Sequence, residues 1–176
     1  MKTLSLAALG FALLLAAAGP ASGIGLVQSP SVLLRFSSMV GVQGPFVGED
    51  NPIRDIPGDG LPWVVKRVEG FVTTRGQVTI VVRGLVFPDD PSVPPELRGK
   101  NDEDEFRAIV SCLVDDGTGH VVPANVATPG FPASTSGNAF ISAKIDLPKP
   151  CFAPIVFIVA GDEDDWLAVT GVDARP

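Results

Sequence analysis

Residues 139–160 read AFISAKIDLPKPCFAPIVFIVA and contain two kinds of β-strand pattern. In residues 139–147, apolar and polar side chains alternate, so an extended chain would have one apolar face and one polar face. Residues 153–160 are apolar throughout, which is typical of a central strand that is covered on both sides. The stretch therefore predicts two neighbouring strands of different depth in a β-rich core.

Further short segments share this β-branched and aromatic character, and none has a sustained helical period. They are residues 63–74, 77–87, 106–114, 121–127 and 166–170. The first two meet at Arg75-Gly76, where glycine can adopt the positive φ that a tight hairpin requires. We predict an all-β fold, an antiparallel β-sandwich of about seven strands and of immunoglobulin or fibronectin III-like size. A small β-barrel is the alternative.

The N-terminus has the order of features found in a secretory signal peptide. Lys2 precedes an uncharged apolar run at residues 4–18, and Gly19-Pro20 and the small residues at 21–23 follow it. The run is shorter than the ~20 residues that a membrane helix needs. We predict cleavage after about residue 23, no membrane span in the mature chain, and a secreted or periplasmic location.

Residues 24–62 differ from the rest of the chain in their density of glycine and proline. Glycine and proline at this density prevent long helices and strands, and only residues 31–36 have a strand pattern. We predict an irregular N-terminal extension over residues 24–62, ending at Pro62-Trp63, and a β-sandwich domain over residues 63–176.

The predicted mature chain is acidic. Signal removal takes away Lys2 and no acid, which leaves 12 of the 13 basic residues against 20 acidic ones and a net charge of −8. The sequence has no run of Lys and Arg of the kind that binds phosphate, so nucleic acid is not expected as a partner. The expected partner is a protein or a glycan, and a monomer is as compatible with the sequence as an oligomer.

The chain has two cysteines, Cys112 and Cys151, and two allow a single intramolecular pairing. Outside the cytoplasm, an even number of cysteines is typical of disulfide bonding. We therefore predict a Cys112–Cys151 disulfide with a structural role.

Strand alternation predicts that the loops divide between two ends of the sandwich. The turns at 75–76, 115–120 and 148–152 fall at one end, which also brings Cys112 close to Cys151. The loops 88–105, 128–138 and 161–165 fall at the other end and carry two acidic runs. Carboxylates from both runs could bind calcium, which takes six to eight oxygen ligands; the candidate ligands are Asp102, Asp104, Asp162, Asp164 and Asp165. The alternative is a pair of solvated acidic loops.

No catalytic or cofactor motif is present in the sequence. His120 is the only histidine and falls in a glycine-rich turn, where we expect a solvated side chain. For Trp63 and Trp166 we expect core or edge packing, with a carbohydrate-stacking platform as the alternative. The predicted function is a non-catalytic exported module with a binding, adhesion or cell-envelope role and no cofactor. The alternatives are a hydrolase whose carboxylates assemble only in the fold and a calcium-dependent binding domain.

Overall fold

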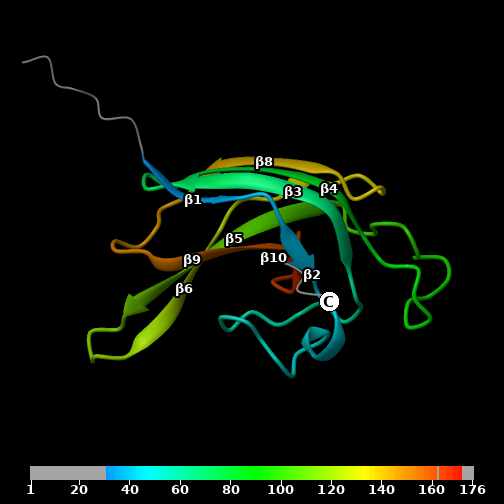
Figure 1. Cartoon of the computed structure of the whole chain (residues 1–176), viewed down its shortest axis with the longest axis horizontal. Coiled ribbons are helices and arrows are strands. Elements are labelled where there is room, and N and C mark those ends of the chain that lie inside the picture. Colours follow the sequence, from blue (N-terminus) through cyan, green and yellow to red (C-terminus); the bar gives the residue numbers. More distant parts are fainter. Residues whose placement is uncertain (1–30, 162, 172–176) are drawn as a thin grey trace, which may run out of the picture.

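The computed structural model describes residues 31–161 and 163–171. The predicted signal peptide lies outside the described residues. Two antiparallel sheets pack face to face, one across the top of Figure 1 and one below it. The predicted all-β sandwich is confirmed. No helix within the described part of the chain is long and apolar enough to cross a membrane.

The upper sheet has four strands in the order β1-β3-β4-β8 (Figure 1). The strands are β1 (Val32–Phe36), β3 (Val64–Thr73), β4 (Gln77–Val86) and β8 (Ala139–Lys144). The β3–β4 hairpin turns at Gly76, which has φ of 80° and whose N–H donates to the Thr73 carbonyl at 2.9 Å. The predicted hairpin is therefore confirmed, and its glycine has the required conformation.

The lower sheet follows the order β2-β10-β9-β5-β6. Its strands are β2 (Met39–Gly41), β10 (Trp166–Thr170), β9 (Phe152–Ala160), β5 (Glu105–Asp115) and β6 (Val121–Ala127), and β7 (Phe131–Pro132) also pairs with β5. The apolar strand β9 lies between β10 and β5, as its composition predicted. All seven predicted strands are present.

The core lies between the two sheets and takes apolar side chains from both. Val72, Ile80 and Ile141 of the upper sheet and Phe106 and Phe157 of the lower sheet are fully buried. These residues occupy the inward positions of their strands, so the period-two pattern read from the sequence corresponds to the direction of the core.

Residues 31–62 are more integrated than the predicted irregular extension. The strand pattern at 31–36 forms β1, an edge strand of the upper sheet, but β2 was not predicted and forms an edge of the lower sheet. A short 3-10 helix, η1 (Gly44–Phe46), and loops make up much of the remainder. Val42 and Ile56 are buried in the common core. β2 has only three residues, too few for periodicity to indicate a strand.

The predicted disulfide is confirmed. Cys112 of β5 and Cys151, immediately before β9, are bonded, with their Cα atoms 4.9 Å apart. The strand register explains why the two cysteines lie close together, because Leu113 pairs with Phe152 in adjacent antiparallel strands. The bond therefore joins neighbouring strands of one sheet near the end at which β5 turns into β6.

Candidate functional site

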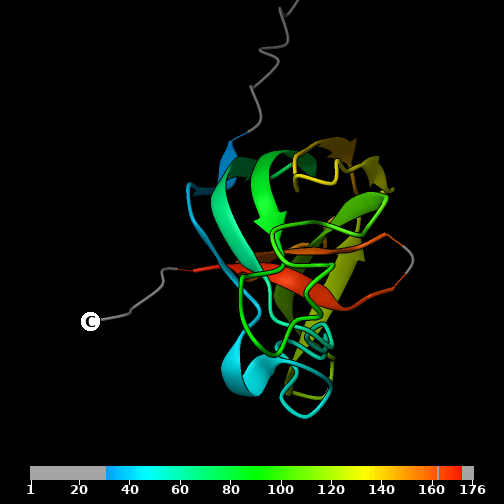
Figure 2. The same cartoon turned by 90° about the vertical axis from the view of Figure 1, so that its right-hand side faces the viewer.

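The loops divide between two ends as strand alternation predicted. Glu105 and the 161–165 turn lie together because Phe106 pairs with Ala160. The β4–β5 connection joins the same end, where Asn101 N–H donates to the Thr135 carbonyl at 2.8 Å. This connection lies on the side of the molecule that faces the viewer in Figure 2. We call the end formed by loops 87–104, 128–138 and 161–165 the acidic end.

Acidic side chains of two loops line one hollow of about 420 Å³ at the acidic end. The lining residues are Asp102, Glu103, Asp104, Glu105, Gly161 and Glu163. The predicted convergence of the two acidic runs is therefore observed for these residues. Asp162, one of the candidate calcium ligands, lies outside the described residues.

Part of the second acidic run is engaged by a cation instead of being free for a metal. Arg107 of β5 donates from Nη2 to Asp164 Oδ1 at 2.6 Å and to the Glu163 carbonyl at 2.9 Å. Within residues 31–161 and 163–171, no group of three or more His, Cys, Asp or Glu side chains is placed to hold a metal ion. Calcium binding at the acidic end stays a prediction.

Two carboxyl groups at or next to the acidic end, Asp59 and Asp165, have a raised pKa. Burial raises the pKa of Asp59 above its ordinary value of 3.8, the charges of Asp102 and Glu163 add to the increase, and the Leu61 N–H, donating to Oδ1 at 2.7 Å, opposes it. Burial and the nearby charge of Asp59 also raise the pKa of Asp165. Both groups are disfavoured in their charged form, so they destabilise the folded state at neutral pH.

We expect Asp59→Asn to stabilise the protein at pH 7. The amide oxygen can still accept the Leu61 N–H, whereas the buried charge is removed. A raised carboxyl pKa means that stability falls as pH rises from the unfolded-state pKa through the folded-state pKa. The gain should therefore be full at pH 7 and vanish as the pH falls below about 3.8. Urea unfolding at several pH values measures it.

Asp90→Asn serves as a control of opposite sign. The backbone N–H and hydroxyl of Ser92 lower the pKa of Asp90, so its charge stabilises the folded state above the unfolded-state pKa. This variant should be less stable than the wild type at pH 7. If Asp59→Asn also destabilised the protein at neutral pH, the charge of Asp59 would not destabilise the folded state as its burial implies.

These carboxyl groups do not form an acid–base pair in a cleft. Neither Asp59 nor Asp165 lines the acidic hollow. A larger cleft of about 610 Å³ lies beside Trp63 and Pro88, and Asp90 is the single ionisable residue among those that line it. Neither of these two hollows brings together two carboxyl groups of raised pKa, an arrangement that would favour the hydrolase alternative.

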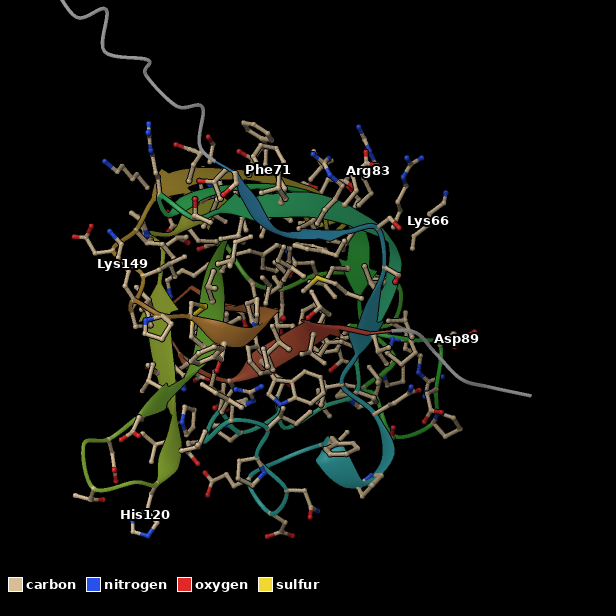
Figure 3. The ribbon with its side chains drawn as sticks, turned by 60° about the vertical axis from the view of Figure 1, so that its left-hand side comes forward. Lys66, Phe71, Arg83, Asp89, His120 and Lys149 are labelled. Carbon is tan, nitrogen blue, oxygen red and sulfur yellow. A yellow bond between two sulfur atoms is a disulfide. The ribbon has the colours of Figure 1, made fainter. Side chains whose placement is uncertain are left out.

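The aromatic and histidine candidates have ordinary structural environments. Trp63 and Trp166 are 1% and 2% exposed, so both are core residues and neither is a carbohydrate-stacking platform. His120 projects into solvent from the β5–β6 turn (Figure 3), and its Nδ1 is 2.9 Å from the Thr118 hydroxyl and 3.8 Å from Asp116 Oδ2. The expectation of core packing is confirmed for both tryptophans.

A second surface, not predicted from the sequence, is the outward side of the upper sheet. Its strands carry the basic residues Arg35, Lys66, Arg67, Arg83 and Lys144, all exposed, and Glu69 is their single acidic residue. Nineteen of the 20 acidic residues of the chain thus lie outside these four strands. We call this surface the basic face. Figure 3 shows Lys66, Phe71 and Arg83 projecting from it.

Strand register brings the side chains of the basic face into rows across the sheet. Arg67 pairs with Arg83, and the next outward row places Glu69 beside Val81 and Val81 beside Phe140. Phe140 is 59% exposed. Outward positions recur every second residue, so these aromatic and basic side chains form one continuous surface.

The basic side chains are available for external contacts. Arg67 Nη2 donates to Glu69 Oε2 at 2.9 Å, so the only carboxylate of the face already has a cationic partner. The Arg35 guanidinium lies 5.5 Å from the centroid of the Phe71 ring, a cation–π arrangement. Lys66 and Arg83 line an open hollow with Arg67. The face therefore combines positive charge with exposed aromatic surface.

Sequence reasoning missed the basic face because its members are far apart along the chain. Arg35 and Lys144 are separated by more than 100 positions, and each lies in a different strand. The usable signal was that four strand segments, read together, contain one acid in an otherwise acidic chain. Comparison of the chain with known protein families, with curated proteins and with solved structures finds no match.

Proposed function

We propose that this chain is an exported, non-catalytic binding domain whose binding surface is the basic face. The observation that carries the proposal is the segregation of charge: an acidic protein presents five exposed cations and one paired acid on a single sheet. Such segregation favours an anionic partner at this surface and disfavours it elsewhere on the molecule.

The strand order also supports a binding module. The seven long strands, in the orders β3-β4-β8 and β10-β9-β5-β6, support the proposal of an immunoglobulin-like sandwich with β1 and β2 added at its edges. Sandwiches of this kind serve many functions, so the order alone assigns none. The proposal therefore depends on the basic face.

The proposal is tested by chromatography on a sulfonate resin at pH 7 and low ionic strength. The wild type should be retained despite its sequence pI of about 4.6, because the basic face can bind the resin. Arg83→Glu should elute at lower salt. Lys149→Glu, which makes the same charge change on an exposed residue of the 145–151 link (Figure 3), should elute close to the wild type.

The matched pair separates local charge from net charge. Equal losses of retention in Arg83→Glu and Lys149→Glu would mean that only the total charge matters, and the basic face would not be a binding surface. Circular dichroism of both variants checks that each is folded, which is expected because both side chains are exposed.

A further inference from the structure

We infer that the partner of the basic face is a linear anionic polysaccharide that carries carboxylate or sulfate groups. This inference rests on the proposed function and adds the chemical class of the ligand. Four features of the face carry it: two successive hollows, aromatic surface next to hydroxyl groups, a majority of arginines among the cations, and the limited length of the positive surface.

The first feature is an elongated shape. One hollow of about 510 Å³ is lined by residues that include Arg35, Phe71 and Thr79, and a second of about 490 Å³ is lined by residues that include Arg67 and Arg83. Phe71 and Arg67 are four residues apart in β3, a span of roughly 13 Å at the usual rise of a strand. A chain lying along β3 would therefore pass over both hollows.

The second feature is the mixture of aromatic and hydroxyl side chains. Phe71 pairs with Thr79, and Thr79 pairs with Ser142, so an aromatic ring and two hydroxyl groups share one outward row. Exposed Phe140 lies in the adjacent row. A sugar ring has an apolar C–H face and a hydroxyl edge, and this surface offers a partner to each: a ring face and groups that donate or accept hydrogen bonds.

The third feature is the kind of cation. Three of the five basic residues of the face, Arg35, Arg67 and Arg83, are arginines. The planar guanidinium donates two parallel hydrogen bonds to a carboxylate or sulfate, a geometry that the lysine ammonium cannot reproduce. Arg67 and Arg83 are opposite each other across the strands, and Arg35 lies two outward rows away, opposite Phe71.

The fourth feature is the limited length of the positive surface along the strands. Beyond the Gly84 end of the face, the chain enters the acidic end, where Asp102, Glu103 and Asp104 lie. A lipid bilayer would need cations beyond this end, whereas a short polysaccharide segment that spans the two hollows ends before these carboxylates. The distribution of charge therefore favours a single polysaccharide chain over a membrane.

Isothermal titration of the full chain compares three probes: an oligogalacturonate, a neutral β-glucan oligosaccharide of the same length, and vesicles of phosphatidylglycerol and phosphatidylcholine. We expect binding of the oligogalacturonate, weakened by added NaCl, and no comparable binding of the other two. Arg83→Ala should weaken it about tenfold, which is about 1.4 kcal/mol, because the hydrogen bonds from the guanidinium to the anion are lost.

Matched variants test the location of the site. Phe140→Ala should weaken oligogalacturonate binding severalfold, whereas Phe152→Ala removes a similarly exposed ring outside the face and should not. Lys149→Ala is the control for Arg83→Ala. Equal effects in either pair would place the binding elsewhere and overturn the inference.

Two other outcomes would also overturn it. Binding only to phosphatidylglycerol vesicles would identify a membrane surface as the partner, and equal binding of the neutral oligosaccharide would remove the role of charge. A protein that ignored all three probes yet was retained on the sulfonate resin through Arg83 would contradict the polysaccharide inference and leave the proposed function standing.

Discussion

Replacing Cys112 and Cys151 together by alanine is expected to lower the free energy of unfolding by on the order of 4 kcal/mol. The bond joins positions that are 39 residues apart in sequence, and a cross-link over that distance restricts the unfolded chain substantially. Loss of this restriction is the main reason for the expected effect. For a domain of this size the melting temperature should fall by roughly 10 °C.

Urea unfolding of the double variant, with and without reductant, measures this effect. Reductant should destabilise the wild type and leave the variant unchanged, so that the two proteins become similar in stability. Replacing both cysteines avoids a free thiol in the core, since Cys112 is fully buried. A variant within about 1 kcal/mol of the oxidised wild type would contradict the expectation that the cross-link restricts the unfolded chain substantially.

The long strands could be predicted because each shows its burial pattern over at least five residues. In β8, Ile141 is buried while Ser142 and Lys144 are exposed, and this alternation of apolar and polar residues is visible in the sequence. The alternation of strand direction then predicted which loops share an end, in agreement with the disulfide predicted from the two cysteines. These inferences needed only the local periodicity of each strand and the reversal of direction between successive strands.

The basic face and β2 could not be predicted for a different reason. Both depend on register between segments that are distant in sequence. The pairing of Gly41 with Ala168 spans most of the chain, and the basic face exists only because β1 and β8 pair with the β3–β4 hairpin, with Arg35 opposite Phe71 and Phe140 opposite Val81. Local composition at residues 39–41 contains no information about this partner.

The distribution of charge connects the acidic end with the basic face. Nearly all acids lie in loops and in the other sheet, and Asp59 and Asp165 remain destabilising at neutral pH. The carboxylates at these two positions therefore do not stabilise the folded protein. Under the proposed function, they would repel an anionic partner from the acidic end and leave the basic face as the preferred contact.

Gly41→Ala is expected to destabilise the protein by about 3 kcal/mol. Gly41 lies in β2 of the lower sheet, but a Cβ atom added there would collide with the Trp63 carbonyl group, whose carbon would be only 2.7 Å away. The obstacle is backbone, which cannot rotate aside as a side chain can. The hydrogen bond from Trp63 N–H to the Val42 carbonyl, 2.9 Å long, holds the two segments together.

Gly60→Ala is the matched control, because a Cβ atom at Gly60 meets no atom within 4 Å and its backbone is outside the left-handed region. There the smaller entropy of the unfolded chain should leave stability unchanged or raise it by up to ~1 kcal/mol. Urea unfolding of both variants gives the comparison. If Gly41→Ala were no less stable than Gly60→Ala, then β2 would not pack directly on the backbone of Trp63. The large difference that we expect would instead mean that residues 39–42 close one side of the sandwich, so that a segment rich in glycine and proline is part of the domain's core structure.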